Sequence, residues 1–380
     1  MNVPSPTQEP IETTPAMSRR RFLKRAGVVG AAIPIATGLV ISACYDDPTG
    51  GPVEPGVDPQ NQKPGTPAAT PPPADRVTEI DNEHKDAVTE FLQNQKAPLT
   101  KGKGMQELAP RTEDGVKIFE LTIDEVDWEV EPGKTEKARG YNNQIPGPTL
   151  RATVGERVRI NVKNNLAEST AVHWHGLLVP NAMDGVPFLT QEPIKPGATY
   201  TYEFTIRNAR SHMYHSHHNS ADQVNRGLLG AFIVLPANRA EYAQYDREFI
   251  LIMNDTLLGF TLNGKSFPAT DALVAQKGER VLIRWMNEGM MYHPMHLHGM
   301  AMEVFERDGY PVSPPFKCDT IDVPPGNRFD CIIQADEPGL WAFHCHVLSH
   351  AEHEGGFFGL VTALAVEDAT FKVADLLAKV

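Results

Sequence analysis

The feature that most constrains this chain is a repeated histidine pattern, in which two histidines are separated by a single residue. With 14 histidines in 380 residues, random placement predicts roughly half of one such pair. The chain has four pairs: His173/His175, His215/His217, His296/His298 and His344/His346. Residues i and i+2 of a β-strand point to the same side, so each pair offers two imidazoles to one face. The pattern predicts strands that bind metal ions, and imidazole suits zinc, copper, iron or nickel.

The sequence around these pairs alternates apolar and polar residues, as half-buried strands do. One alternating series begins near Gly115 with "VKIFELTIDEVDWEV", and a second begins with "REFILIMN" at residues 247–254. Turn signals such as Pro-Gly and Asn-Asn separate the short runs. This texture predicts an all-β protein of two Greek-key β-sandwich domains, over residues 115–240 and 245–368, with a C-terminal tail over 369–380.

The two halves of the chain also echo each other. "TLRATVGERVRINVKNN" precedes "VHWHG", and "ALVAQKGERVLIRWMNE" precedes "HPMHLHG". In both halves a strand containing Gly-Glu-Arg-Val leads to a histidine pair followed by glycine. This similarity indicates a duplicated domain.

The cysteine in "HCHVLSH" adds a second kind of donor to the last histidine pair. In a strand, His344 and His346 face one way and Cys345 faces the other. Cys345 can then meet His350 and His293, and a set of two histidines and one cysteine is the arrangement of blue-copper sites. The alternative interpretation, histidines with surface or structural roles, suits one isolated pair better than four pairs and a cysteine.

Charge and cysteine content exclude other classes of protein. The formal net charge of −13 and the absence of a basic patch argue against a nucleic-acid partner. Four cysteines are too few for a disulfide scaffold. Cys318 and Cys331 lie on two β runs joined by "PPGN", so a cross-strand disulfide and two buried thiols both remain open.

The N-terminal segment, residues 1–43, has the pattern of a targeting signal. "SRRRFLK" precedes an apolar run and looks like a twin-arginine export signal. The alternative is a membrane-anchor helix, which the glycines and Pro34 of the run disfavour. "ISAC" resembles a lipoprotein cleavage box in which Cys44 is lipidated, the alternative being a chance cysteine. We therefore expect twin-arginine export to the periplasmic side of the cell envelope and a lipid anchor at Cys44.

The segment between this signal and the β series has two parts. Residues 44–77 are proline-rich and predict a disordered, flexible tether. Residues 78–114 form a lead-in, in which the apolar spacing over 78–95 predicts a short amphipathic helix.

"VHWHG", "MYHSH", "HPMHLHG" and "HCHVLSH" look like the four copper-binding motifs of multicopper oxidases, and "NNQIPGPTL" and "MDGVPFLTQEPIKPG" also resemble that family. The likeness covers residues 115–367, and its two cupredoxin-like domains resemble the two-domain, laccase-like branch. The resemblance implies four copper ions per active unit: one type 1, one type 2 and two type 3. The type 1 ligands would be His293, Cys345 and His350, and the type 2 ligands would be His173 and His296. The type 3 ligands would be His175, His215, His217, His298, His344 and His346.

The resemblance also implies a mechanism. A donor gives one electron at a time to type 1 copper, Cys345 passes it to the type 3 ligands, and four electrons reduce dioxygen to two waters. Asp184 matches the family's acidic residue near type 2 copper, although Asp-Gly also forms turns. Glu352 is the candidate for a second proton-transfer acid. Phe357 takes the axial position where many relatives have methionine, which predicts a raised reduction potential.

The remaining histidines and methionines near the motifs are not expected to be ligands of these copper ions. His212 and His218 flank a ligand motif, where they could support the ligands from behind, but a surface position is the favoured expectation. His353 lies close enough to the type 1 site to shape substrate access. Six methionines gather around the third motif, either as core residues or as a surface that receives metal ions. They are Met286, Met290, Met291, Met295, Met300 and Met302.

The implied function is laccase-like oxidation of phenolic or aromatic donors. A metallo-oxidase of Cu(I), Fe(II) or Mn(II) in copper tolerance is the alternative, and a copper-binding or storage lipoprotein of the envelope is the alternative of another class. A two-domain copper nitrite reductase is disfavoured because no cysteine lies between Cys44 and Cys318. With only two domains, the family pattern implies a homotrimer in which neighbouring chains share each three-copper cluster.

Overall fold

The computed structural model describes residues 74–96 and 104–378. The predicted signal, Cys44 and nearly all of the predicted tether lie outside these residues. Strands dominate the described part, so the prediction of an all-β fold with a short N-terminal helix is confirmed. Within the described ranges, none of the helices combines the length and apolarity that crossing a bilayer requires.

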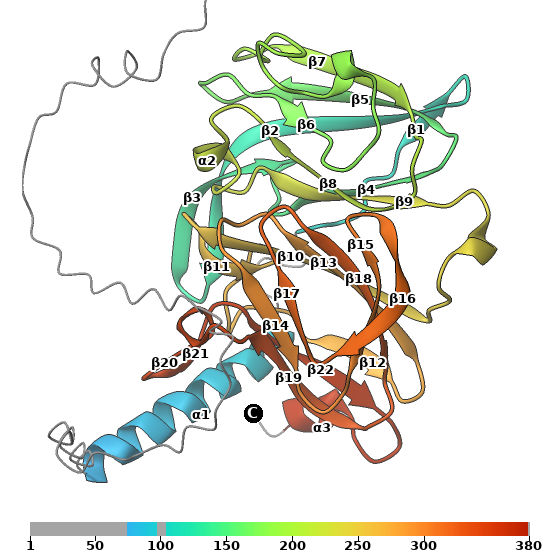
Figure 1. The fold of residues 1–380 in the computed structure, drawn as a ribbon. Coiled ribbons are helices and arrows are strands. Elements are labelled where there is room, and N and C mark those ends of the chain that lie inside the picture. Colours follow the sequence, from blue (N-terminus) through green and yellow to red (C-terminus); the bar gives the residue numbers. More distant parts are fainter. Residues whose placement is uncertain (1–73, 97–103, 379–380) are drawn as a thin grey trace, which may run out of the picture. The chain divides into compact units, whose positions relative to one another are not determined.

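The first β-sandwich consists of strands β1 to β9 (Figure 1). One sheet has the order β1-β2-β5-β7, with β3 also paired to β2, and the other has the order β4-β9-β8-β6. The strands are β1 (Arg111–Glu113), β2 (Val116–Glu131), β3 (Lys134–Tyr141), β4 (Gly147–Thr153), β5 (Arg157–Asn164), β6 (Val172–His173), β7 (Thr199–Thr205), β8 (Arg210–Ser216) and β9 (Leu229–Leu235). Short helical turns connect them: η1 (Asn181–Met183), α2 (Ser220–Gln223) and η2 (Arg239–Glu241).

The second β-sandwich consists of strands β10 to β22. Its sheets have the orders β11-β10-β13-β18-β15-β16 and β12-β22-β19-β14-β17, and β20 and β21 form a separate hairpin. The strands are β10 (Arg247–Thr256), β11 (Gly259–Leu262), β12 (Leu273–Gln276), β13 (Arg280–Asn287), β14 (His293–Leu297), β15 (Met302–Arg307), β16 (Tyr310–Cys318), β17 (Thr320–Val323), β18 (Arg328–Gln334), β19 (Gly339–Cys345), β20 (Glu352–His353), β21 (Gly356–Phe357) and β22 (Val361–Glu367). The turn η3 (Leu348–His350) lies between β19 and β20.

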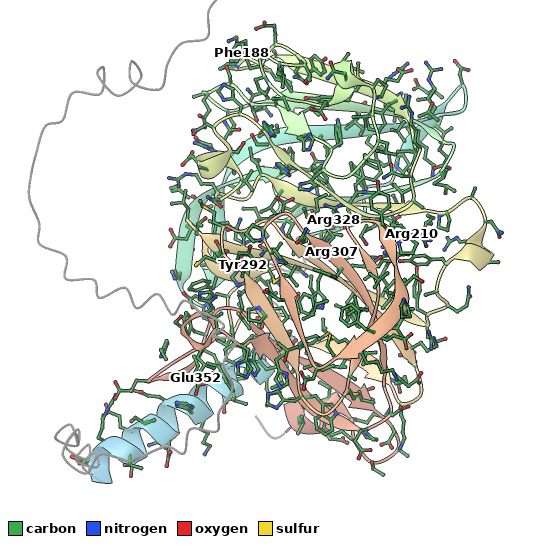
Figure 2. All side chains as sticks on the ribbon, viewed as in Figure 1. Phe188, Arg210, Tyr292, Arg307, Arg328 and Glu352 are labelled. Carbon is green, nitrogen blue, oxygen red and sulfur yellow. The ribbon has the colours of Figure 1, made fainter. Side chains whose placement is uncertain are left out.

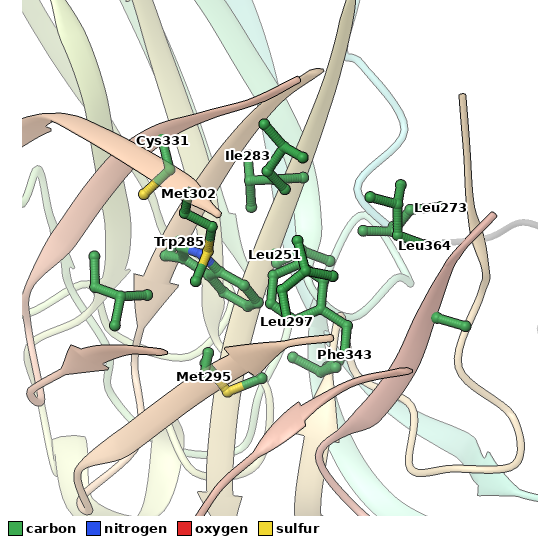
Figure 3. Close-up of a cluster of buried hydrophobic side chains, with 14 of the residues drawn as sticks. Leu251, Leu273, Ile283, Trp285, Met295, Leu297, Met302, Cys331, Phe343 and Leu364 are labelled. Carbon is green, nitrogen blue, oxygen red and sulfur yellow. The ribbon is translucent and has the colours of Figure 1, made fainter. Parts of the chain in front are cut away.

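Alternating apolar side chains fill the space between the two sheets of each sandwich. In the second sandwich, Trp285 packs edge-on against Phe343 at a ring distance of 5.0 Å, among aliphatic and methionine side chains (Figure 3). Met286, Met295 and Met302 are fully buried, so the core interpretation holds for these three methionines. Met290 and Met291 are exposed.

The two sandwiches pack against each other within one compact unit, residues 70–380. Apolar residues of β8 and β9 meet apolar residues of β10 and β13. Beside them lies a buried polar network in which Arg284 donates to Asp330 at 2.6 Å and to Ser211 of the first sandwich at 2.9 Å. A buried ion pair with its hydrogen bonds satisfied fixes orientation more than it adds stability.

Two helices lie outside the sandwiches. α1 (Ala74–Lys96) begins four residues before the predicted start of the helix, inside the range assigned to the tether, and buries Phe91 and Leu92. α3 (Val373–Leu377) forms in the predicted C-terminal tail and contacts α1.

Candidate metal centres

The three predicted type 1 ligands converge inside the second sandwich. Strand β14 pairs antiparallel with β19, with Met295 opposite Cys345 and His296 opposite His344. His293 and Cys345 therefore turn toward the core, and the turn η3 brings His350 to the same place. The Cys345 Sγ lies 3.7 Å from Nδ1 of His293 and 3.7 Å from Nδ1 of His350. All three side chains are buried.

The spacing of these donors fits one metal ion. The three ligand atoms lie within 4.8 Å of one another. The centre of an equilateral triangle with edges like the two sulfur–nitrogen distances is about 2.1 Å from each corner, close to a metal–nitrogen bond length. Two imidazoles and a thiolate in a trigonal set select copper of the blue type.

Asp255 of β10 orients His293, and no sequence motif pointed to it. The Nε2–H of His293 donates to Oδ2 of Asp255 at 2.8 Å, with both side chains fully buried. The backbone amides of Met290 and Met291 donate to the same carboxylate. Burial alone would raise the pKa of Asp255, but these hydrogen bonds outweigh it and the pKa is lowered. The arrangement leaves Nδ1 of His293 free to bind a metal. A carboxylate that accepts the other ring N–H commonly orients metal-binding histidines in this way.

Phe260 of β11 is the aromatic ring beside these ligands. It stacks on His350 with a centroid distance of 4.3 Å and an interplanar angle of 23°. Phe357, predicted at the axial position, has its ring contact with Phe267 at 6.0 Å. No ring contact within the described residues joins Phe357 to His293 or His350, and its axial role stays a prediction.

The histidines of the first two motifs form a group at the edge of the first sandwich, which we call the N-terminal set: His173, His175, His215 and His217. Strand β6 pairs with β8 so that His173 lies opposite His215. Ring centroids within the set are 5.4 to 6.3 Å apart, and Nδ1 of His175 lies 3.3 Å from Nε2 of His215. One ligand atom from each of His173, His175 and His215 lies within 4.8 Å of the others.

Asp184 lies beside this set, as its sequence position predicts. Nδ1 of His173 is 2.8 Å from the Asp184 carbonyl oxygen and 3.5 Å from its Oδ1. A proton on Nδ1 donated to the carbonyl leaves Nε2 free to bind a metal. The Asp184 carbonyl is thus placed to orient His173, and its carboxylate lies beside the same ring.

The histidines of the last two motifs form the C-terminal set: His296, His298, His344 and His346. Their ring centroids are 4.9 to 5.8 Å apart, and Nε2 of His298 lies 3.1 Å from Nε2 of His344. Nδ1 of His344 lies 3.0 Å from the Cys345 carbonyl oxygen, and Nδ1 of His296 lies 2.9 Å from Oγ1 of Thr320. Both rings are therefore oriented by hydrogen bonds at Nδ1.

Electrostatics favours neutral imidazoles at two members of the N-terminal set, His175 and His215. Burial, reinforced by the nearby Arg328 guanidinium, lowers the pKa of His175 to about 3. Burial lowers the pKa of His215 as well. Arg328 of β18, labelled in Figure 2, donates from Nε to the Ser211 carbonyl at 2.9 Å and so links this region to the second sandwich. Neutral imidazole is the form that binds metals.

The structure does not bring the two sets together in one chain. Every histidine ring contact in the described residues that involves either set joins members of the same set. The predicted type 2 pair, His173 and His296, therefore belongs to two separate groups.

Other predicted residues have mixed outcomes. Glu352 lies on β20 beside α1 (Figure 2), and within the described part no hydrogen bond or ion pair joins it to either histidine set. His212, expected on the surface, is fully buried and its Nε2 bonds to the Ala209 carbonyl. The expectation was wrong because β8 lies between its own core and the second sandwich.

Cys318 and Cys331 are both free thiols, which favours the thiol alternative over the disulfide.

Two β-sandwiches with a buried two-histidine, one-cysteine set and two histidine groups define a cupredoxin-like metalloprotein. Family models described as "Multicopper oxidase" match residues 122–239 and 240–364. The chain belongs to the multicopper oxidase family. Membership implies copper as the metal.

Solved structures and curated relatives support this assignment. The blue copper oxidase from Nitrosomonas europaea matches with a TM-score of 0.61 and 31% identity, over 66% of this chain and 85% of that one. The multicopper oxidase mgLAC matches with a TM-score of 0.62 and 35% identity, over 66% of this chain and 86% of that one. Copper resistance protein A from Escherichia coli is 39% identical over 137 residues, which is 36% of this chain and 22% of that protein. The chain covers less than half of the length of the curated relatives it matches.

Proposed function

We propose that the protein is a copper-dependent oxidase that couples four one-electron oxidations of a donor to the reduction of dioxygen to water. The observation that carries this proposal is the placement of Cys345. Its sulfur lies in the buried type 1 set, while the neighbouring His344 contacts His298 in the C-terminal set. A single peptide bond therefore joins the electron-accepting site to the histidines of the oxygen site. A storage protein has no use for such a connection.

The proposed residue roles follow the two geometries. His293, Cys345 and His350 would hold type 1 copper, which when bound supplies one-electron transfer. The N-terminal and C-terminal sets would hold one type 2 and two type 3 copper ions. The Asp184 carboxylate would hold and release a proton beside His173, supported by the 3.5 Å distance from its Oδ1 to Nδ1 of that histidine. Glu352 has no comparable support.

We propose that the complete oxygen site forms between two copies of the chain, in a homotrimer. Each chain carries both histidine sets without a ring contact between them, so each set needs a partner. Phe188 and Leu189, four and five residues beyond Asp184, are 73% and 78% exposed, and Figure 2 shows Phe188 at the outer end of the first sandwich. An exposed aromatic–aliphatic pair in the loop that follows Asp184 is suited to contact with a second copy.

We propose laccase-like oxidation of phenolic or aromatic donors, with metallo-oxidase activity as the second candidate. One observation favours the second: Met290 is 63% exposed and Met291 is 37% exposed, and both donate their amides to Asp255 beside His293. Thioethers are soft ligands suited to Cu(I). The name of the relative copper resistance protein A points the same way.

Export by the twin-arginine route and lipid anchoring at Cys44 remain our proposals from the sequence.

The test is oxygen consumption by the copper-loaded protein with a phenolic donor and, separately, with Cu(I). We expect four donor molecules oxidised per dioxygen, without release of hydrogen peroxide. Cys345→Ser should abolish turnover and the visible absorption of the cysteine–copper bond while the protein remains folded, because serine is nearly isosteric. Cys318→Ser is the matched control. Copper binding without oxygen consumption would instead support a storage role.

A further inference from the structure

The hairpin β20–β21 begins two residues after His350, and the segment that follows its return strand, residues 358–360, holds the backbone of two proposed type 1 ligands. The amide of Leu360 donates to the His350 carbonyl at 3.0 Å, and the Cys345 amide donates to the Leu360 carbonyl at 3.0 Å. The Phe358 amide donates to the Ala351 carbonyl at 3.0 Å. A displacement of residues 358–360 would therefore move both Cys345 and His350.

Helix α1 lies along this hairpin (Figure 1). At the hairpin tip, Nη2 of Arg76 pairs with Oε1 of Glu354 at 2.8 Å. About two turns further along, at His84, the helix backbone comes so close that a Cβ on Gly356 would lie 3.1 Å from Cα of His84. Gly356 also has φ +111°, a conformation that glycine adopts at no steric cost.

At its other end α1 is anchored by a buried aromatic contact. Phe91 is 3% exposed and stacks on Phe267 at 5.1 Å. Phe267 in turn meets Phe357 of the hairpin at 6.0 Å and donates its amide to the Gly359 carbonyl at 3.0 Å. Two contacts therefore connect Phe91 to the segment that holds His350.

A side-chain amide fixes how far along its axis α1 docks. Nε2 of Gln95 donates to the Thr270 carbonyl at 3.1 Å, and the Ala272 amide donates to Oε1 of Gln95 at 2.9 Å. These bonds join the helix to the loop between β11 and β12, which also contains Phe267. The Arg76–Glu354 pair is exposed and contributes little by comparison with the buried Phe91.

We propose that α1 is a positioning element for the type 1 site. It braces the β20–β21 hairpin from outside the sandwich and thereby keeps His350 in place opposite Cys345. Groups that support metal ligands from behind set the rigidity of the site and its hold on the metal. Phe91 is the main positioning residue, acting through Phe267. This inference rests on the proposed type 1 site.

The test compares Phe91→Ala with two matched variants, Phe91→Leu and Glu90→Ala. Phe91→Leu keeps an apolar side chain in the same pocket, and Glu90 is the exposed neighbour. Hydrogen exchange is measured in the copper-free protein over residues 351–360. Copper-loaded protein is then challenged with a chelator, and the absorption and reduction potential of the cysteine–copper site are recorded.

For Phe91→Ala we expect exchange over residues 351–360 and copper loss from the type 1 site each to rise roughly tenfold, with a shifted potential. Exchange in β2 and β5 of the first sandwich should not change. Phe91→Leu should recover most of the effect and Glu90→Ala should show none. Faster exchange confined to α1, with wild-type copper retention and potential, would overturn the proposal.

Two further arms keep the result interpretable. If Phe91→Ala does not fold, Gln95→Ala loosens the same helix without opening the core, and the same outcomes apply. If the wild-type protein shows no cysteine–copper absorption, the proposed function fails. The exchange measurement on the copper-free protein then still decides whether α1 braces the hairpin.

Discussion

Asp255 accepts a hydrogen bond of 2.8 Å from Nε2–H of His293, and neither side chain is reached by solvent. The carboxylate therefore decides which ring nitrogen of His293 faces Cys345. A ligand whose tautomer is fixed before metal binding loses less freedom when the metal arrives.

Asp255→Ala should lower the affinity of the type 1 set for copper by roughly 10- to 100-fold, because His293 is no longer oriented. Asp255→Asn should fall between this variant and the wild type, since its amide oxygen can still accept the Nε2 proton. Chelator competition monitored by visible absorption measures the effect. Asp336→Asn, an exposed carboxylate on a surface turn, is the control, and equal copper retention in all three variants would contradict the role of Asp255.

Glu288 should make the protein less stable as the pH rises. Its Oε1 is buried without a hydrogen-bond partner, and burial, partly opposed by Arg328, raises the pKa of Glu288 to about 8. In the unfolded chain the same group has a pKa of about 4.3. The folded protein therefore holds a proton that the unfolded chain releases. The contribution of Glu288 to the free energy of unfolding is complete below about pH 4 and is lost as the pH rises through 8.

Glu288→Gln removes this titration. The free energy of unfolding of the variant relative to wild type should increase by roughly 4 kcal/mol between pH 5 and pH 9. Urea unfolding at both pH values measures it, with the exposed Glu337→Gln as control. A difference that does not depend on pH would show that Glu288 is ionised in the folded protein.

Gly359→Ala should damage the type 1 site more than its backbone conformation alone explains. Gly359 has φ +64°, and a Cβ there would lie 2.4 Å from the His350 carbonyl oxygen. Gly133 has φ +74°, and a Cβ there would meet no atom within 4 Å, so Gly133→Ala reports the conformational cost alone, about 1 kcal/mol. We expect Gly359→Ala to cost about 3 kcal/mol or more in denaturant unfolding and to lose type 1 copper. Equal costs for the two variants would contradict the close packing at His350.

Phe188→Ser combined with Leu189→Ser should dissociate the assembly without unfolding the chain. Both side chains are exposed, so their loss costs the single chain little, whereas an interface would lose two apolar anchors. Light scattering gives the oligomeric state, and oxygen uptake should fall together with it. Phe316→Ser, at an aromatic residue that is 47% exposed, is the control. A variant that stays fully assembled and active would exclude this loop from the interface.

The part of the site that follows from strand periodicity was predictable from sequence. Alternation alone separates Cys345 from His344 and His346, and the structure places the sulfur with His293 and His350 as that argument requires. The two sandwiches also followed from alternation and turn spacing.

Contacts between distant segments were not predictable in this way. Asp255 lies 38 residues before His293, on a strand whose pairing with its neighbours sequence alone does not specify. His212 was misplaced because the alternation rule assumes one solvent face, whereas four consecutive residues of β8, from Ser211 to Tyr214, are buried. The early start of α1 was missed because the proline-rich composition before it hides where the tether ends.

The pairing of β14 with β19 places His296 opposite His344 and Met295 opposite Cys345. Inserting or deleting one residue in either strand would exchange the donors offered to the two sites, and both would be lost together. A change of two residues would preserve which side chain faces which site. Functional variants of this chain should therefore tolerate insertions and deletions only in the loops beyond β14 and β19, or in steps of two residues within these strands.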